Sequence, residues 1–248
     1  MYLTRFRVNT ARPGARRLLS SPQSLHAAVM VSFPAFLPTS EQAPRILWRL
    51  DRNARAEAFL YLVSPAEPDL THLVEQAGWP VAASAPDTPG WETRGYAPLL
   101  ERLAEGSSWA FRLTANPVHH IRRKEGEPTK RTAHVTPRHQ KRWLLDRQER
   151  CGFRVLETPP RPDQLSDPEY TRHDLLVRDQ RTLSFTKSDE GTTRSPKVTL
   201  LTVTFDGHLQ VTDPQALRHT LVTGLGRGKA YGCGLMTLAA PVNAAPRG

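Results

Sequence analysis

Glycine and basic residues alternate near the end of the sequence, where residues 224–235 read GLGRGKAYGCGL. Several glycines let a backbone approach an anion closely and direct N–H groups at it, and nearby cations add charge. This pattern predicts a phosphate-binding loop. Its candidate ligands are Gly224, Gly226, Arg227 and Lys229. The alternative is a tight helix-to-strand connection in which the glycines permit close packing.

Two nucleotide-binding motifs do not fit this loop. A P-loop needs Ser or Thr after its Gly-Lys pair, but Ala230 follows Lys229, and Thr223 stands where the first glycine belongs. A GxGxxG fingerprint started at Gly224 ends on Lys229. Both motifs also need a strand before the loop and a helix after it, and the reverse order is predicted here. A mononucleotide-binding enzyme is therefore disfavoured, and we expect no cofactor.

The charge balance points to a polyanionic partner. The 248 residues include 34 Lys and Arg against 24 Asp and Glu, a net charge of +10. Such a balance is typical of proteins that bind nucleic acid or an anionic membrane, although it also suits a merely soluble basic surface. At 38% hydrophobic residues, the chain can bury a core, so it is not a disordered protein.

Membrane, secretion and metal signals are missing from the sequence. No apolar run approaches the ~20 residues that a span requires, and the start, MYLTRFRVNT, lacks the apolar core of a signal peptide. A membrane-surface role would need a basic amphipathic helix with an aromatic apolar face. Cys151 and Cys233 form no CxxC pair, and no His/Cys spacing resembles a zinc site. We therefore expect a cytoplasmic protein with reduced thiols, no metal and no membrane partner.

Basic residues also gather in two other stretches. Residues 174–205 are predicted as a long hairpin around the polar tip Thr186–Pro196. Residues 119–142 hold eight Lys and Arg against two acids, first in a basic loop and then in a helix. The candidates of the two stretches for contacts with a polyanion are Arg178, Arg181, Lys187, Arg194, Lys197, Arg122, Arg123 and Lys141. The alternatives are a charged edge that prevents strand aggregation and a solvated loop and helix face.

The first part of the chain predicts the element order β-α-β-β-α. Ser21 before Pro22 is a helix start, because the hydroxyl caps and proline suits the first turn. The predicted elements are a strand over 2–8, a basic loop with Arg12, Arg16 and Arg17, a helix over 22–32, strands over 46–51 and 58–63, a helix over 69–77 and a strand near 79–84. The residues from 80 to 98 have the proline and glycine content of a linker.

The second part predicts the same order once more. Its elements are a strand over 108–115, a helix over 137–150, a strand over 154–156, the hairpin, a helix from 214 to about 223 and a last strand over 231–238. We therefore predict an α+β fold of two tandem ferredoxin-like (βαββαβ) domains. The predicted boundaries are 1–90 and 91–248.

Several stretches together resemble a known family. They are the opening MYLTRFRVN, His26 in the first helix, FRLTANP at 111–117, WLLDRQERCGF at 143–153 and the glycine loop. The chain resembles the CasE family, the precursor-crRNA endoribonucleases of type I-E CRISPR systems. The resemblance implies an enzyme that binds the stem-loop of a CRISPR repeat RNA and cuts once at the 3′ base of the stem, without metal. It also implies a 2′,3′-cyclic phosphate end, and a product-bound enzyme that joins other Cascade subunits.

Metal-free RNA cleavage needs a base for the 2′-hydroxyl, an acid for the 5′-oxygen and positive charge on the phosphorane. Histidine suits such proton transfer because its ordinary pKa is about 6.5. A lone helical histidine is more often a packed or surface residue, but the resemblance makes His26 the candidate base. The resemblance also makes the hairpin around 174–205 the element expected against the stem.

The sequence departs from the family pattern beside this histidine. Family members often carry tyrosine three residues before it, where Gln23 stands here, and a basic residue shortly after it, where Ala27, Ala28 and Val29 stand. The candidates for the acid and the stabilising charge are therefore Arg16, Arg17, Arg227, Lys229 and Tyr231. The departure leaves open a non-catalytic subunit that binds the crRNA stem-loop, which His26→Ala would distinguish from an enzyme.

Overall fold

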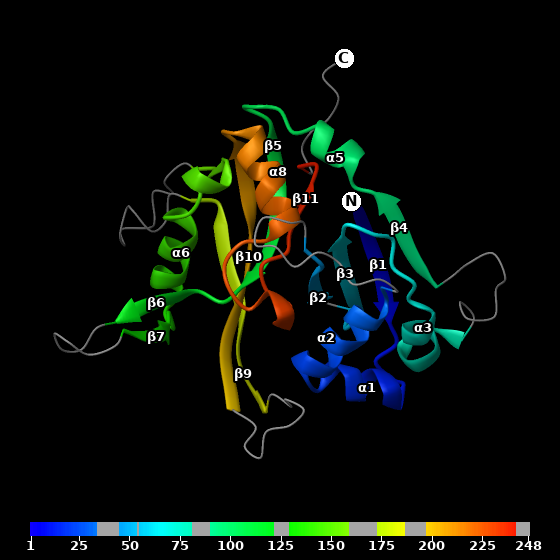
Figure 1. Cartoon of the computed structure of the whole chain (residues 1–248). Helices are drawn as coiled ribbons and strands as arrows, with labels where there is room; N and C mark the ends of the chain where they lie inside the picture. Colours follow the sequence, from blue (N-terminus) through cyan, green and yellow to red (C-terminus); the bar gives the residue numbers. More distant parts are fainter. Residues whose placement is uncertain are drawn as a thin grey trace.

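The chain folds into two βαββαβ units that lie side by side (Figure 1). The main sheet of each unit is antiparallel and has the strand order of a ferredoxin-like fold, in which the fourth strand pairs with the first and the first with the third. The predicted α+β fold of tandem ferredoxin-like domains is thereby confirmed. The computed structural model describes residues 1–33, 45–53, 55–80, 90–121, 129–158, 173–186 and 197–241.

The N-terminal unit is a four-stranded sheet covered on one face by helices. Its elements are β1 (Tyr2–Val8), α1 (Pro13–Leu19), α2 (Pro22–Val31), β2 (Leu47–Arg52), β3 (Ala58–Ser64), α3 (Thr71–Ala77) and β4 (Trp91–Gly95), with the sheet order β2-β3-β1-β4. Strand β1 alternates, so that Phe6 and Val8 are buried while Arg7 is exposed. Helix α2 begins as predicted, because Ser21 accepts a hydrogen bond from the N–H of Ser24.

Two predictions for the N-terminal unit are wrong. The stretch with Arg16 and Arg17 is not a loop but helix α1, whose Ala15 is fully buried. Residues 91–95 are not linker but strand β4, which pairs along β1; the hydroxyls of Thr93 and Thr4 are hydrogen-bonded to each other. Most of the strand predicted near 79–84 lies outside the described residues. Because β4 belongs to the first sheet, we propose that the boundary between the units follows Gly95 rather than residue 90.

The C-terminal unit repeats the topology with a longer third strand. Its elements are α5 (Ala97–Glu101), β5 (Ser108–Ala115), β6 (Val118–Ile121), β7 (Lys130–Ala133), α6 (Pro137–Leu145), η1 (Glu149–Cys151), β8 (Phe153–Val155), β9 (Leu175–Thr186), β10 (Lys197–Val211), α8 (Pro214–Thr223), η2 (Lys229–Tyr231) and β11 (Met236–Ala239). The sheet order is β11-β5-β10-β8, and β9 pairs with the rest of β10 to form the predicted hairpin. This hairpin projects beyond the sheet (Figure 1).

Three other predictions for this unit need correction. The helix predicted over 137–150 ends at Leu145. The 3-10 turn η1 follows, and Gly152 ends this turn with a φ of 76°. The last strand begins only at Met236, because Lys229–Tyr231 form the 3-10 turn η2. Part of the predicted basic loop is the small two-stranded sheet of β6 and β7.

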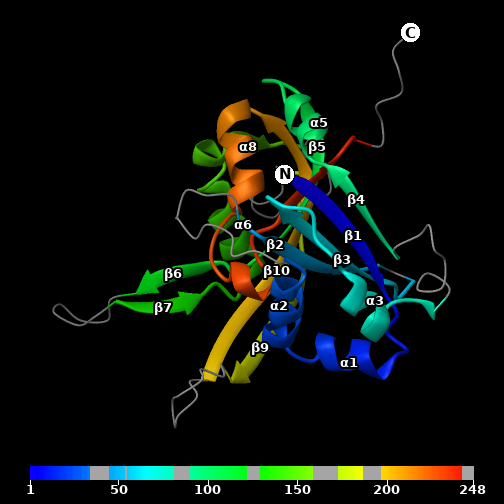
Figure 2. The ribbon, with the colours of Figure 1, turned by 45° about the vertical axis from the view of Figure 1, so that its right-hand side comes forward.

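Each unit has a hydrophobic core, and the core of the C-terminal unit includes residues of the N-terminal sheet. The N-terminal core gathers Phe6, Val29 and Leu60 between the sheet and its helices. The C-terminal core includes Leu47 and Val63 from the N-terminal sheet. The two units are therefore packed together rather than strung on a linker, and the views agree that the loop after α8 lies beside α2 (Figures 1 and 2).

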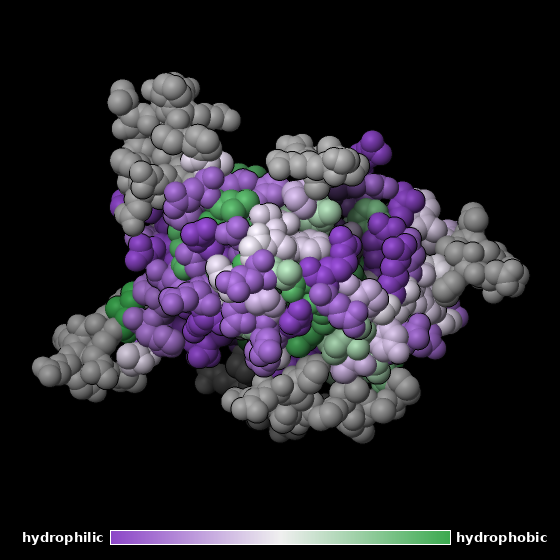
Figure 3. All heavy atoms as spheres, turned by 90° about the horizontal axis from the view of Figure 1, so that it is seen from above, coloured by the Kyte–Doolittle hydropathy of each residue, from purple (hydrophilic) through white to green (hydrophobic). Residues whose placement is uncertain are grey.

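The described surface is largely polar. Seen from above, hydrophilic side chains cover most of it, with only small apolar areas between them (Figure 3). Among the described helices, none is both long and apolar enough to cross a membrane.

Candidate active site

His26 lies in α2, one turn after the helix start. Its ring is half-buried, and its Nδ1 is a buried atom with no hydrogen-bond partner among the described residues. Burial lowers the pKa of His26 below its ordinary value of 6.5, because a desolvated imidazolium is costly. The ring is therefore neutral near pH 7, which is the form that can accept a proton.

The glycine loop is a packed connection with its own internal hydrogen bonds. Gly224, Gly226, Gly228, Gly232 and Gly234 all have φ between 77° and 90°, a region that other residues rarely adopt. A Cβ on Gly232 would lie 2.7 Å from the ring of Trp48, and one on Gly224 would lie 2.8 Å from Leu47. Gly224 and Gly232 therefore serve close packing against β2, which is the alternative interpretation of this motif.

The N–H groups of the loop are partly committed to the protein. The N–H of Gly224 donates to the carbonyl of Thr220 at 2.9 Å, and that of Gly234 donates to Thr114 at 2.7 Å. Phosphate binding by Gly224 and Gly226 stays a prediction. The exposed side chain of Arg227 lies where the loop forms a β-bridge with Asn116.

The loop places η2 directly against the helix that carries His26 (Figure 2). Burial and the neighbouring Arg45 lower the pKa of Lys229, which is half-buried in this turn. The ring of Tyr231 meets Phe185 of β9 edge-on at 4.7 Å. The turn that carries Lys229 and Tyr231 therefore packs on α2 from the other unit, although it lies more than 200 positions from His26 in the sequence.

The other two predicted catalytic cations lie on α1, which is packed against α2. Arg16 and Arg17 are exposed, and Arg16 donates a hydrogen bond to the carbonyl of Ala11 at 2.8 Å. Within the described part of the chain, neither guanidinium pairs with a carboxylate. Both are therefore available to an anion that approaches this side of α2.

A cavity of about 170 Å³ opens between the two units beside the start of α2. Pro22 and Leu25 of α2 form part of one wall, and Tyr231 belongs to the lining as well. Four arginines line this central cavity, namely Arg52, Arg112, Arg178 and Arg181. Sequence reasoning identified the last two and missed the first two. Arg112 lies in the FRLTANP stretch, but nothing in the sequence shows that its side chain faces the other unit.

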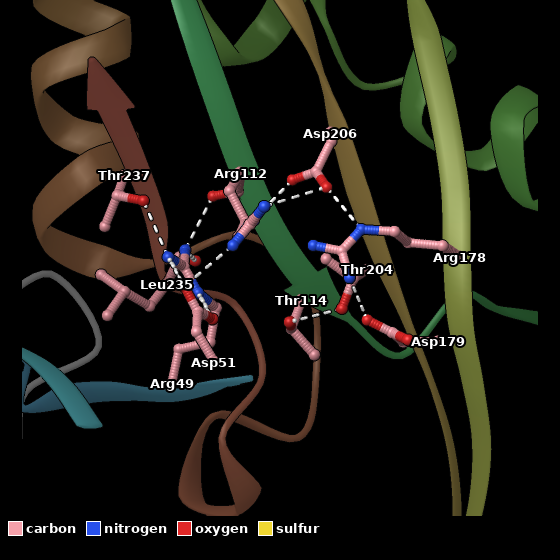
Figure 4. A network of polar contacts seen from close by, with 10 residues as sticks. All are labelled: Arg49, Asp51, Arg112, Thr114, Arg178, Asp179, Thr204, Asp206, Leu235 and Thr237. Carbon is pink, nitrogen blue, oxygen red and sulfur yellow. Dashed lines mark hydrogen bonds and ion pairs between the residues drawn. The ribbon is translucent and has the colours of Figure 1, made fainter. Parts of the chain in front are cut away.

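An ion-pair network forms one side of the central cavity (Figure 4). Asp206 of β10 accepts hydrogen bonds from Arg112 and Arg178, both at 2.6 Å. Burial would raise the pKa of Asp206, but these two guanidinium groups outweigh it and lower that pKa below its ordinary value. Arg178 also pairs with Asp179, whose φ of 52° coincides with a bulge between β9 and β10. Arg178 is thus bound to two carboxylates of the C-terminal unit.

The network continues to a buried arginine of β2. Arg49, whose side chain is 2% exposed, donates to both carboxylate oxygens of Asp51 at 2.7 and 2.9 Å. It also donates to the carbonyls of Arg112 and Leu235 and to the hydroxyl of Thr237. We call Arg49, Asp51, Arg112, Asp206 and Arg178 the seam, because their bonds join the two units.

The remaining predicted RNA-binding residues are spread over the C-terminal unit. Lys197 is exposed at the start of β10, and Lys141 of α6 is half-buried, which lowers its pKa. Arg122, Arg123, Lys187 and Arg194 lie outside the described residues. The residues that the structure describes contain no cluster of His, Cys, Asp or Glu that could hold a metal ion.

Comparisons with known proteins agree with this architecture. A family model for a CRISPR associated protein matches residues 1–240. The CRISPR-associated endoribonuclease Cse3 of Thermus thermophilus is 30% identical, and the match covers 96% of this chain and 100% of that protein.

Solved structures of similar proteins cover the same length. The structure of CRISPR endoribonuclease Cse3 bound to a 19-nucleotide RNA matches with a TM-score of 0.72 at 28% identity, over 96% of this chain and 100% of that chain. Thermus thermophilus Cse3 bound to an RNA representing a pre-cleavage complex matches with a TM-score of 0.69 at 27% identity, over 96% and 98%. Cas6e from Escherichia coli K-12 shares the fold, with a TM-score of 0.59 at 22% identity over 97% and 100%.

Proposed function

The chain belongs to the CasE (Cse3) family of CRISPR-associated endoribonucleases, and on that premise we propose that it processes precursor crRNA. It binds the stem-loop of the CRISPR repeat and cleaves the strand once at the 3′ base of the stem. The reaction uses no metal and leaves a 2′,3′-cyclic phosphate. The enzyme then keeps its product and serves as a subunit of the Cascade complex. These steps follow the family resemblance, and the relatives named as RNA-bound endoribonucleases support the substrate class.

The residues around α2 suit the proposed reaction. Neutral His26 takes the proton of the 2′-hydroxyl, whose oxygen attacks the neighbouring phosphorus. The P–O5′ bond breaks as the cyclic phosphate forms, and the leaving oxygen receives a proton from Lys229 or Tyr231 on η2. A lowered pKa makes the Lys229 ammonium a readier proton donor. Arg16 and Arg17 add positive charge where the phosphorane becomes more negative.

One observation carries this proposal: α2 lies against η2. The helix of a histidine that burial keeps neutral and the turn of a half-buried lysine are packed together there, each from a different unit. A base in one unit and an acid in the other would sit on opposite sides of a strand lying between them, as in-line displacement requires. Such precise positioning on rigid elements is what proton-transfer catalysis needs.

The test is an RNA cleavage assay in EDTA with a stem-loop RNA of the host's repeat. We expect a single cut with a cyclic-phosphate end, and a loss of roughly 10²–10⁴-fold in the rate constant for His26→Ala with unchanged RNA affinity. His219→Ala is the matched control, because His219 is exposed on α8, away from α2. Tight binding without a cut by the wild type would instead indicate the non-catalytic crRNA-binding subunit. Absence of binding would refute both.

A further inference from the structure

The central cavity contains two arginines that no described carboxylate neutralises. Arg52 at the end of β2 and Arg181 of β9 both line it and are exposed. In the described part of the chain, neither forms an ion pair, whereas Arg112 and Arg178 are held by Asp206. Two positive charges therefore line one small cavity without a counter-charge among the residues that the structure describes.

The acids of the cavity are already engaged. Asp51 is bound by Arg49 on both oxygens, and Asp179 pairs with Arg178. These carboxylates therefore do not compensate Arg52 or Arg181. A ligand that completes the charge balance here must bring a negative group of its own.

The rest of the lining is apolar or carries hydroxyl groups. One part consists of flat or branched hydrophobic side chains, and another offers hydroxyls that can donate and accept hydrogen bonds. The apolar members include Leu25, Trp48, Leu50 and Leu183, and the hydroxyl-bearing members include Ser21, Thr114, Thr202, Thr204 and Tyr231. The volume of about 170 Å³ compares with the roughly 150 Å³ of an engineered cavity that admits benzene, so it suits one planar ring.

We propose that the central cavity holds one unpaired nucleotide of the RNA, with its base against the apolar wall and its phosphate at Arg52 and Arg181. This inference rests on the proposed function, because it assigns a subsite to the same RNA. Pro22 lines the cavity, and His26 follows it one turn later, about 6 Å along the helix axis. The nucleotide is therefore one that flanks the cleaved phosphate, and it anchors the single strand that leaves the stem.

The first arm of the test removes a base from the RNA. Stem-loop RNAs with an abasic residue on one side or the other of the cut are compared with the intact RNA. For the wild type, we expect one of the two abasic RNAs to bind roughly 10-fold more weakly, as for the loss of one stacked base. Leu183→Trp fills the cavity from an outer strand, and it should bind the intact RNA as weakly as the wild type binds that abasic RNA. The variant should not discriminate between the two RNAs.

The second arm changes the charge. Arg52→Ala and Arg181→Ala should each weaken binding of the intact RNA and reduce its salt dependence by about one counterion. Arg94→Ala removes the same charge from an exposed position of β4 outside the cavity, and it should leave the salt dependence unchanged. Thermal unfolding checks that each variant is folded. If Leu183→Trp does not fold, the two arginine variants still decide the test.

The outcomes separate this inference from the proposed function. Suppose that the wild type cuts the intact RNA, but that neither the wild type nor Leu183→Trp binds the abasic RNAs differently from the intact RNA. The proposed subsite is then wrong, and the proposed function stands. If a free nucleoside monophosphate competes as strongly as the RNA strand does, the cavity is a free-nucleotide site and the inference is overturned. If the wild type neither binds nor cuts the intact RNA, the proposed function fails, and the subsite fails with it.

Discussion

Arg49 and Arg52 lie three residues apart on the same strand and have opposite surroundings. Arg49 belongs to the seam, is nearly fully buried and donates hydrogen bonds to Asp51, Thr237 and two carbonyls. Arg52 belongs to the central cavity, is exposed and has no ion-pair partner among the described residues. An arginine thus connects the two units by internal hydrogen bonds at position 49, whereas at position 52 its charge has no carboxylate partner among the described residues.

This difference shows how the protein separates rigidity from binding. A buried guanidinium must satisfy its donors inside the protein, as Arg49 does, so it is not available to a ligand. A cavity arginine without a carboxylate keeps its full charge for an anion. The seam therefore fixes the relative position of the two units, and this position defines the shape of the cavity between them. The predictions below test whether the two regions are as distinct as this comparison claims.

The largest effect is expected for Arg49→Ala. The substitution leaves Asp51 with only the longer Arg112 contact and removes the donors from two buried carbonyls. Removing one partner of a buried pair typically costs about 3–5 kcal/mol, so the free energy of unfolding should fall by that amount. Urea denaturation measures it. A loss below about 1 kcal/mol would mean that the seam does not hold the units together.

Gly232→Ala tests how tightly the glycine loop is seated on the N-terminal unit. The new Cβ would meet Trp48 at 2.7 Å, at a φ of 79°. Overpacking and backbone strain together should lower the free energy of unfolding by about 2–4 kcal/mol. Gly106→Ala is the matched control, because Gly106 has the same φ of 79° and nothing within 4 Å of its Cβ. It should cost only the strain, about 1 kcal/mol. Equal losses would show that the contact with Trp48 is unimportant.

The acid dependence of stability tests the seam at Asp206. Its pKa is lower in the folded protein than in the unfolded chain, so its contribution is present above the unfolded pKa and is lost as the pH falls through the folded one. We expect about 1–2 kcal/mol from these charged hydrogen bonds. The free energy of unfolding should therefore fall more steeply below pH 4 for the wild type than for Asp206→Asn.

The control for this measurement is Asp146→Asn. Asp146 pairs with Arg142 on the surface of α6, where both side chains are largely exposed. Its removal should leave the steepness of the acid transition unchanged, because exposed pairs contribute little. An Asp206→Asn profile parallel to that of the wild type would show that the seam carboxylate is not specially stabilised.

The sequence predicted those elements whose signals are local. Ser21-Pro22 and Asp213-Pro214 begin α2 and α8 at the predicted residues, since proline and a side-chain cap act within one turn. Strand β5 occupies its predicted range, because its alternation is regular. Strand β4 was missed because it is short, lies at the sheet edge and is flanked by glycine; only its pairing with β1 defines it. Helix α1 was missed for a similar reason, since packing on α2 and α3 stabilises its seven residues.

The candidate site was predictable only in part. The family resemblance pointed to His26, whose own surroundings in the sequence are typical of any helical histidine. The contact between α2 and η2 joins residues from opposite ends of the chain, and no local sequence pattern predicts it. Whether an arginine is neutralised likewise depends on carboxylates from other strands. Arg178 was predicted to bind RNA, which stays a prediction, and the sequence did not indicate its two carboxylate partners, Asp179 and Asp206.

The smallest effect on stability is expected for Arg52→Ala, and it completes the comparison with Arg49. An exposed side chain without an ion-pair partner in the described chain contributes little to folding, so the free energy of unfolding should change by no more than about 0.5 kcal/mol. Removing one positive charge from the cavity lining could even relieve repulsion with Arg181. Urea denaturation beside Arg49→Ala checks this. If the free energy of unfolding fell by several kcal/mol, Arg52 would stabilise the fold as Arg49 does. The distinction between a structural arginine and a ligand-binding arginine would then be wrong.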